Sequence, residues 1–242
     1  MKFYAHNFIG NNEADVILPF SGMDSADSLN TSLRKMPTDW YYRKNQIVYK
    51  YNSLGHRSVE IDQLTDDYIL VAGCSYTEGV GVELERSYPY LLANKFGCSY
   101  YNLGVGGSGI DILMHNLLVW ISIVPKKPKV VIIQWPESTR CALIEEQSSL
   151  LFPAGIWNTD PVAQEFMLAG DRLHFFNTRK ILAEKLIQTV IPGKLINFLI
   201  NGKINSESTI SAIPHDVARD CSHPGIGSNI KFAEKLYKAI TI

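Results

Sequence analysis

The feature that most constrains the fold is a set of short aliphatic runs that recur along the chain. Residues 67–73 (DYILVAG), 128–135 (PKVVIIQW) and 194–200 (KLINFLI) are almost continuously apolar and have the length of single strands. Runs of this kind are typical of strands that are buried on both faces of a parallel sheet. We therefore expect these three segments to form the core of one sheet.

Helical patterns alternate with these strands. Ser87 is expected to cap a helix that stops at Gly97, and Ser108 is expected to cap a second helix with one apolar face. Residues 99–103 (SYYNL) lie between the two helices and predict another strand. Strands that alternate with helices favour a parallel sheet with right-handed crossovers. The sequence thus predicts an α/β protein, a three-layer α/β/α sandwich with a mainly parallel sheet.

Residues 137–176 interrupt this alternation. They contain STRCALIEEQSSLLFPAGIW, which predicts two short strands around an EEQS turn and hence an inserted hairpin. A helix near residues 178–191 follows, and an amphipathic helix over residues 228–240 closes the chain. Its buried face is expected to consist of Ile230, Ala233, Tyr237 and Ile240.

The first part of the chain differs in composition from the rest. Residues 1–66 are polar, irregular and rich in Asn, Asp and Ser, apart from a short strand expected from Ile47. We predict that residues 1–66 form an N-terminal extension packed on the core. Residues 67–242 are predicted to form a single domain that carries the inserted hairpin.

The overall composition excludes several classes of function. Of the 242 residues, 46% are hydrophobic, and 23 Lys and Arg against 24 Asp and Glu leave a net charge of −1. Such a chain is not disordered, and it has no basic surplus for a nucleic acid or an anionic membrane. The start lacks a signal-peptide pattern, no run is long enough to span a membrane, and the four cysteines form no CxxC pair. We expect a cytoplasmic protein with reduced thiols, and the sequence does not predict its oligomeric state.

The first candidate for chemistry is Ser75, which directly follows the first buried strand in the segment GCSYTEG, residues 73–79. A side chain at the C-terminal end of a central parallel strand lies in the crevice where open α/β sheets bind ligands. The glycines at both ends of the segment permit a tight backbone path that exposes the hydroxyl. Taken alone, the segment also fits a turn serine that caps the next element.

The second candidate is the segment DCSHPG, residues 220–225, just before the last helix. At three-residue spacing on a loop, the carboxylate of Asp220 can orient the imidazole of His223 and stabilise its charged form. Asp220 and His223 would be the acid and the base of a nucleophilic triad. A solvated loop pair is the alternative.

The third candidate is the glycine-rich segment NLGVGGSG, residues 102–109, between a strand and a helix. Its backbone N–H groups are suited to an oxyanion pocket at the positive end of the helix. Gly104, Gly106 and Gly109 also match GxGxxG, and Glu137 after the next strand is placed to bind a ribose. A Rossmann-type nucleotide-binding protein therefore stays open as an alternative. This alternative leaves Ser75 and the DCSHPG segment unexplained.

Together these segments resemble the SGNH (GDSL-like) hydrolase family, from about residue 51 to the C-terminus. GCSYTEG is similar to the nucleophile block, with Cys74 where the family usually has Asp, and NLGVGG is similar to the second block. DCSHPG is similar to the last block, and YNSLGHRS (residues 51–58) is similar to a segment that often precedes the nucleophile strand. The resemblance implies a flavodoxin-like fold and a serine hydrolase that cleaves carboxylic esters.

The resemblance also implies roles for individual residues. Ser75, Asp220 and His223 would form the catalytic triad and pass through an acyl-enzyme. The N–H groups of Ser75 and Gly107 would bind the oxyanion. The substrate would be a small-molecule or carbohydrate ester, with an acyl or O-acetyl group, and no metal or organic cofactor would be needed.

One block departs from the family pattern. The third block normally supplies an Asn as a further oxyanion donor, but here the strand runs into QWPESTR, residues 134–140, which contains no Asn. Trp135, Gln134 and Arg140 are candidates for a replacement donor. Core packing is the alternative for Trp135, and a solvated or hairpin-pairing role is the alternative for Arg140. Removing one such donor from another hydrolase costs about 3–4 kcal/mol, so a catalytically weakened or acyl-transferring relative is a further alternative.

Overall fold

The computed structural model describes residues 8–10, 14–144, 151–155, 159–172, 174–191, 193–201 and 209–241. Its centre is a five-stranded sheet in which every neighbouring pair is parallel. In chain order the strands are β3 (Tyr68–Ala72), β4 (Ser99–Asn102), β5 (Val130–Gln134), β8 (Lys194–Ile200) and β9 (Thr209–Ala212).

The strand order identifies the fold class. Across the sheet the order is β4-β3-β5-β8-β9, which is 2-1-3-4-5 when these five strands are numbered along the chain. This is the flavodoxin-like order, and it differs from the 3-2-1-4-5-6 order of dinucleotide-binding folds. The predicted flavodoxin-like α/β class is confirmed. The edge strand β9 was not predicted, because its four residues are only half-buried and form no continuous apolar run.

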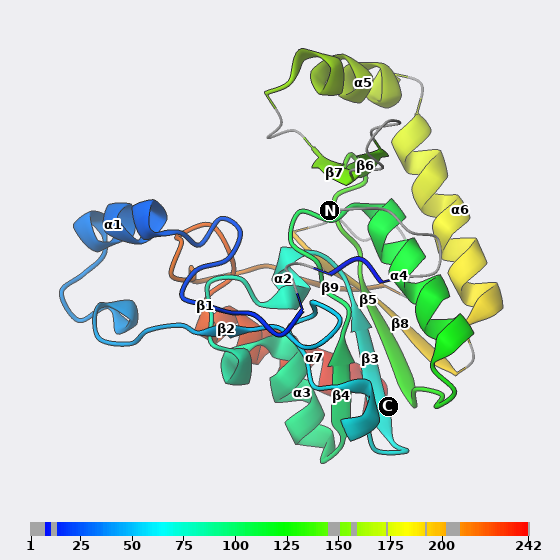
Figure 1. Ribbon diagram of the computed structural model, residues 1–242, viewed down its shortest axis with the longest axis horizontal. Helices are drawn as coiled ribbons and strands as arrows, with labels where there is room; N and C mark the ends of the chain where they lie inside the picture. The colour runs from blue at the N-terminus through cyan, green and yellow to red at the C-terminus, as the bar shows by residue number, and fades with distance from the viewer. Residues whose placement is uncertain are drawn as a thin grey trace.

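Helices cover both faces of the sheet (Figure 1). On one face, α4 (Ile110–Ile123) and α6 (Phe175–Val190) pack Trp120 and Ile187 into a cluster with Leu70. On the other face, α3 (Tyr88–Phe96) and α7 (Ile226–Thr241) pack Leu92 and Phe232 against Val71. Side chains of β3 therefore alternate between two buried clusters, which is why its sequence is apolar throughout. The predicted three layers are confirmed.

One of the two predicted helix caps is wrong. Ser87 is the N-cap residue of α3 and Gly97 is its C-cap, as predicted, although the Ser87 hydroxyl donates to Leu84 O at 2.7 Å and does not bond to the helix. The Ser108 hydroxyl donates to Gly73 O at 3.2 Å, and Gly109 stands at the N-cap of α4 in place of Ser108. Helix α4 begins after Gly109 without any side-chain cap. Ser108 instead joins the start of α4 to the turn that follows β3.

The expected buried face of α7 also needs correction. Ala233 is buried as predicted, and Tyr237 and Ile240 are partly buried against the same cluster, but Ile230 is 41% exposed. The helix packs on both α3 and the edge of the sheet, and this contact is made by a stripe rotated from the predicted one. The buried residues of this stripe are Ser228, Asn229, Phe232, Ala233 and Leu236.

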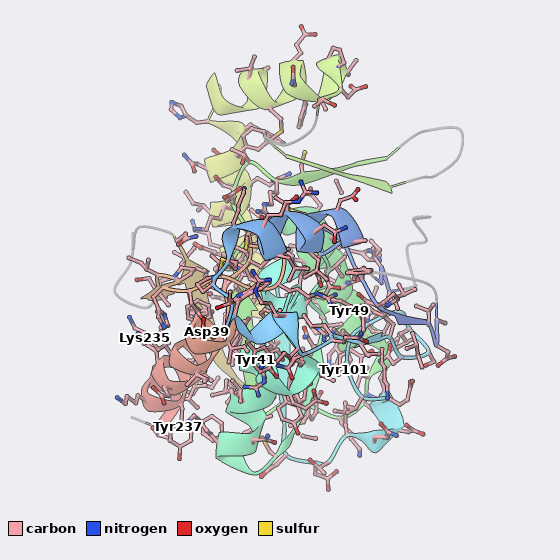
Figure 2. All side chains as sticks on the ribbon, turned by 90° about the vertical axis from the view of Figure 1, so that its left-hand side faces the viewer. Asp39, Tyr41, Tyr49, Tyr101, Lys235 and Tyr237 are labelled. Carbon is pink, nitrogen blue, oxygen red and sulfur yellow. The ribbon has the colours of Figure 1, made fainter. Side chains whose placement is uncertain are left out.

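The segment between β5 and α6 extends beyond the sheet. Strands β6 (Cys141–Ile144) and β7 (Leu151–Ala154) pair antiparallel, which confirms the two strands of the predicted hairpin. The EEQS turn lies outside the described residues. Figures 1 and 2 show this hairpin and helix α5 (Pro161–Arg172) standing away from the three layers. Helix α5 was not predicted, although Asp160 accepts two N–H groups of its first turn and Pro161 is its first residue.

The N-terminal segment contains more structure than its polar sequence suggested. Strands β1 (Ile17–Leu18) and β2 (Tyr49–Lys50) pair antiparallel, and α1 (Ala26–Lys35) is fixed at its start by the Ser25 capping box. The N-terminal segment has a small hydrophobic cluster of its own, formed by the buried residues Tyr42, Ile47, Tyr49 and Tyr51. Figure 2 shows Tyr41 and Tyr49 on this side of the molecule, with Tyr237 of α7 below them.

The remaining elements are short. They are the one-turn helix α2 (Ser75–Glu78) and the 3-10 helices η1 (Tyr41–Arg43), η2 (Ile61–Gln63) and η3 (Leu84–Arg86). No helix among the described residues is both long enough and apolar enough to cross a membrane. The division of the chain at residue 66 stays a prediction.

Candidate active site

Ser75 lies at the C-terminal end of a central strand. Strand β3 ends at Ala72 and helix α2 begins at Ser75, so the chain turns sharply over two residues. A Cβ on Gly73 would lie 2.1 Å from Thr77 Oγ1, so only glycine fits this turn. The sheet order reverses between β3 and β5, and ligand sites of this fold class lie at such a point.

His223 connects Ser75 to Asp220 through two hydrogen bonds. His223 Nε2 is 2.8 Å from Ser75 Oγ, and His223 Nδ1 is 2.5 Å from Asp220 Oδ2. Because an ionised carboxylate only accepts, Nδ1–H donates to Asp220, and Nε2 is left to accept from the Ser75 hydroxyl. The side chains are buried, with residue exposures of 5–7%. The structure thus brings together the three residues that the sequence singled out as catalytic.

The surroundings of Asp220 keep it ionised. Burial alone would raise its pKa, but hydrogen bonds and the charge of His223 outweigh burial and hold the pKa below its usual value. Asp220 Oδ1 also accepts the backbone N–H of Ser222 at 3.1 Å and that of His223 at 3.0 Å. A carboxylate held at both oxygens fixes the orientation of the imidazole.

The loop that carries Asp220 and His223 is closed by its own backbone. Ala218 N–H donates to His223 O at 2.8 Å, and Cys221 adopts a φ of 55° inside the loop. Arg219 N–H donates to Gly81 O at 3.0 Å, and a Cβ on Gly81 would lie 2.6 Å from Ala218 Cβ. The loop is therefore docked directly against the segment that follows α2.

A buried ion pair ties this loop to the N-terminal segment. Arg219 Nε and Nη2 donate to Asp24 at 2.6–3.0 Å, and Tyr49 donates its hydroxyl to the same carboxylate at 2.5 Å. The roles of Asp24, Tyr49 and Arg219 were not predicted from the sequence. The position of Arg219 directly before Asp220 could have indicated a role at the site. Asp24 lies in a polar stretch, and nothing near it in the sequence indicates such a role.

Glu78 is a second buried acid that the sequence analysis left without a role. Its Oε1 accepts from the Tyr51 hydroxyl at 2.7 Å. Burial raises the pKa of Glu78, while the Tyr51 hydroxyl, the charge of Arg57 and the N–H of Gly106 act in the opposite direction. Arg57 itself donates to the carbonyls of Gly79 and Glu78, behind α2. Tyr51 and Arg57 belong to YNSLGHRS, so this segment supports the turn that carries Ser75.

The glycine-rich loop borders the same cavity as Ser75. Gly107 has a φ of 72°, and it lines the cavity together with Ser75. Asn102 holds the start of the loop, because its Oδ1 accepts Gly104 N–H at 2.8 Å and its Nδ2 donates to Thr77 O at 2.8 Å. The two backbone donors predicted for the oxyanion therefore belong to segments that are fastened together.

Trp135 does not lie with these backbone donors, so its prediction as a replacement oxyanion donor is wrong. Its indole Nε1–H donates to Asn197 Oδ1 on β8 at 3.1 Å, and its side chain is buried in the sheet layer. Gln134 is also committed elsewhere. Its Oε1 accepts the Cys74 N–H at 3.1 Å and the Thr77 hydroxyl at 3.2 Å, and its Nε2 donates to Trp135 O. Of the three candidates, only Arg140 lines the cavity.

The cavity has a volume of about 590 Å³ and opens beside the Ser75 hydroxyl. Residues of α2, the glycine-rich loop and the DCSHPG loop line the cavity. The N-terminal segment also contributes to the lining. Its lining residues are Leu18, Phe20, Ser21, Gly22 and Met23.

The glycine-rich loop leaves little room for a dinucleotide phosphate. A Cβ on Gly104 would lie 2.5 Å from Glu78 N, and one on Gly109 would lie 2.3 Å from Arg140 O. These glycines are needed for contacts with α2 and the hairpin segment. Glu137, the ribose ligand of the nucleotide-binding alternative, pairs with Arg140 at 3.3 Å. No group of three His, Cys, Asp or Glu side chains within the described ranges is placed to hold a metal ion.

No protein-family model matches the chain, and no curated protein matches it in sequence. A carbohydrate esterase family 2 enzyme from Corynascus thermopiles (Myceliophthora fergusii) is similar in structure, at 15% identity and a TM-score of 0.44, over 80% of this chain and 70% of that one. A family two carbohydrate esterase from Clostridium thermocellum, in complex with cellohexaose, is 14% identical, with a TM-score of 0.46, over 74% of this chain and 65% of that one. A protein from Desulfitobacterium hafniense DCB-2, described as a lipolytic protein of the G-D-S-L family, is 13% identical, with a TM-score of 0.43, over 71% of this chain and 98% of that one.

Proposed function

We propose that the protein is a serine hydrolase of the SGNH type that cleaves carboxylic esters. The observation that carries the proposal is the chain of hydrogen bonds from Ser75 through His223 to Asp220 at one side of a cavity. A hydroxyl, an imidazole and a carboxylate in this order are the parts of an activated nucleophile. The substrate is proposed to be a small-molecule or carbohydrate ester, with residues 67–242 as the catalytic domain.

The reaction proceeds in two halves. His223 Nε2 takes the proton of the Ser75 hydroxyl while Oγ attacks the carbonyl carbon of the ester. The bond to the alcohol oxygen then breaks, and His223 returns the proton to that oxygen, which leaves the acyl group on Ser75. Water attacks the acyl-enzyme and gives a proton to His223, and Ser75 recovers that proton as the carboxylic acid departs. These steps need no metal or organic cofactor.

Two groups of the chain stabilise the charges that develop. Asp220 holds the imidazole in the required tautomer and stabilises the imidazolium. The N–H groups of Ser75 and Gly107 bind the oxyanion of the tetrahedral intermediate. Both donors are main-chain groups on segments held by Asn102 and Arg57, so they need little reorganisation during the reaction.

The test combines covalent labelling with turnover. Wild type is expected to react with a fluorophosphonate probe and to hydrolyse p-nitrophenyl acetate, and Ser75→Ala is expected to lose both. Ser122→Ala, a substitution on the partly exposed α4 surface, is the control and should retain both. Unlabelled wild type, or equal turnover by wild type and Ser75→Ala, contradicts the proposal. Labelling without hydrolytic turnover would favour the acyl-transferring alternative.

A further inference from the structure

Glu78 is a buried acid that the proposed reaction leaves unused. Three acids are buried among the described residues, and two of them pair with a basic side chain, Asp24 with Arg219 and Asp220 with His223. Glu78 is 1% exposed and lines the catalytic cavity. A buried carboxylate is costly unless it is hydrogen-bonded, so the groups that donate to Glu78 indicate what this acid holds in place.

Two hydroxyl groups in series hold one oxygen of the Glu78 carboxylate. The Tyr51 hydroxyl donates to Glu78 Oε1 at 2.7 Å. Because Tyr51 has a single hydroxyl proton, the Ser21 hydroxyl, 2.6 Å away, donates to the Tyr51 oxygen. Both hydroxyls belong to the N-terminal segment. This segment therefore fixes the position of the carboxylate.

The Glu78 carboxylate also bonds to the glycine-rich loop. Burial raises the pKa of Glu78, whereas the hydrogen bond from the backbone N–H of Gly106 and the charge of His223 lower it. Gly106 directly precedes Gly107, and both glycines line the cavity. The main chains are close as well, since a Cβ on Gly104 would lie 2.5 Å from Glu78 N. The anchored N–H is thus one residue away from the proposed oxyanion donor.

The glycine-rich loop depends on such anchors. Glycine loses more backbone freedom on folding than any other residue, and a loop rich in glycine has few side chains to hold it. Val105 N–H donates to Gly73 O at 3.1 Å, and Ser108 N–H donates to Val105 O at 3.1 Å. Between these two bonds, Glu78 accepts from Gly106. An oxyanion donor is effective when it is fixed in place before the reaction begins.

We propose that Glu78 is a positioning residue for the oxyanion site. Its carboxylate holds the Gly106 N–H and thereby fixes the direction of the adjacent Gly107 N–H. Glu78 acts through the main chain of the loop and does not contact the ester. The inference rests on the proposed function and adds one residue to it.

Kinetics with p-nitrophenyl acetate test this role. Glu78→Met has a similar length but no acceptor, so kcat should fall about 10²-fold at a similar KM, as expected for a donor displaced by about 1 Å. Glu78→Gln retains an oxygen that can accept the Gly106 N–H, and it should recover most of this loss. Glu78→Asp, one methylene shorter, should lose activity as Glu78→Met does, and it takes the place of that variant if Glu78→Met does not fold.

Tyr68→Phe is the matched control. The Tyr68 side chain is buried, and its hydroxyl donates to Lys126 O at 2.6 Å at the start of β3, whereas Ser75 follows the end of this strand. The substitution removes a hydrogen bond far along the strand from the proposed site. It should therefore leave kcat and KM unchanged.

A tetrahedral inhibitor separates positioning from a loss of stability. A trifluoromethyl ketone accepts the Ser75 oxygen at its carbonyl carbon, its carbonyl oxygen becomes an oxyanion, and His223 keeps the proton. Its inhibition constant should rise about 10²-fold for Glu78→Met, in parallel with the fall in kcat, because both depend on the same donors. A variant that only unfolds more easily loses active enzyme but keeps the inhibition constant of the folded fraction.

Amide hydrogen exchange tests the contact without any ester. NMR of protein with isotopically labelled glycine follows the Gly106 N–H, whose signal is assigned by its absence from Gly106→Ala. Exchange should be about tenfold faster in Glu78→Met than in wild type or Tyr68→Phe, because a hydrogen bond to a charged group is lost. Inactive wild type would contradict the proposed function, and exchange would then decide whether Glu78 holds the loop. Equal Gly106 exchange in wild type and Glu78→Met, or an unchanged kcat of Glu78→Met beside active wild type, would overturn the inference.

Discussion

Arg219 and Asp24 are separated by 195 positions in the chain, and Arg219 Nη2 lies 2.6 Å from Asp24 Oδ2. The side chains are 3% and 0% exposed, so this ion pair is shielded from water. Arg219 also packs its guanidinium over the Phe20 ring, 4.7 Å from the centroid. Since Arg219 directly precedes Asp220, the N-terminal segment and the proposed catalytic loop are joined by one side chain.

Removing one partner of this pair should be strongly destabilising. Asp24→Asn leaves a buried arginine without its counter-charge, so the free energy of unfolding should fall by about 3–5 kcal/mol. The double variant Asp24→Leu with Arg219→Met should recover much of this loss, because it leaves no buried charge. Urea denaturation measures all three proteins.

The exposed pair Asp67–Lys129 provides the control. Its atoms are 3.2 Å apart, but the side chains are 71% and 62% exposed. Asp67→Asn should change stability by less than about 1 kcal/mol, because exposed ion pairs contribute little. A similar loss in the free energy of unfolding for Asp24→Asn and Asp67→Asn would mean that the buried ion pair contributes no more to stability than the exposed one.

Asp220→Asn should separate catalysis from folding. An amide at this position can donate to Nδ1, which favours the wrong tautomer of His223, and kcat should fall about 10⁴-fold, as in a well-studied triad. KM and the circular dichroism spectrum should stay near those of wild type. A loss below tenfold would remove Asp220 from the proposed triad.

Stability should fall as the pH drops from about 6.5 to about 4, because of His56. Desolvation lowers the pKa of this fully buried side chain to about 4, from an ordinary value near 6.5. Between these values the unfolded chain binds a proton that the folded protein excludes, so lowering the pH favours unfolding, by about 3 kcal/mol over the whole range. Denaturation of wild type and His56→Gln at several pH values tests this, since the variant should lack this part of the slope. Parallel curves would contradict the expectation.

Removing the hydroxyls of two buried tyrosines should have different effects on stability. The Tyr51 hydroxyl donates to Glu78, and Tyr51→Phe should cost about 1–3 kcal/mol because a buried carboxylate loses a donor. The Tyr100 hydroxyl is buried and has no hydrogen-bond partner in the described part of the chain. Tyr100→Phe should therefore leave stability unchanged or raise it slightly. Thermal unfolding of both variants measures the difference, and equal losses would contradict it.

The elements that the sequence predicted correctly are those in which burial controls composition. Strands β3, β5 and β8 are buried on both faces, so their aliphatic runs identify them. Helix α1 has the sequence ADSLNTSLRK, with little apolar surface beyond two leucines, and its start depends on hydrogen bonds between Ser25 and Ser28. Its two leucines lie one turn apart, but the low overall hydrophobicity of the segment indicated irregular chain.

The proposed site was predictable where its groups lie in short motifs beside regular elements. Ser75 follows strand β3, and Asp220 and His223 precede helix α7, in an order along the chain that matches the topology. Long-range partners such as Asp24 were not predictable, because nothing close to it in the chain indicates a contact with Arg219. Trp135 was a plausible donor by type, but its direction depends on Asn197 of a neighbouring strand.

Part of the cavity wall comes from a different stretch of the chain than the groups proposed to react. Leu18, Phe20 and Met23 belong to the segment before the sheet, whereas Ser75 and His223 are carried by loops of the sheet itself. In the proposed enzyme, changes at Leu18 or Met23 can therefore alter which ester fits while bond cleavage stays intact. Phe20 differs from them, because its ring packs against Arg219, the neighbour of Asp220, so a change at Phe20 would affect both the fit of the ester and the group that orients His223.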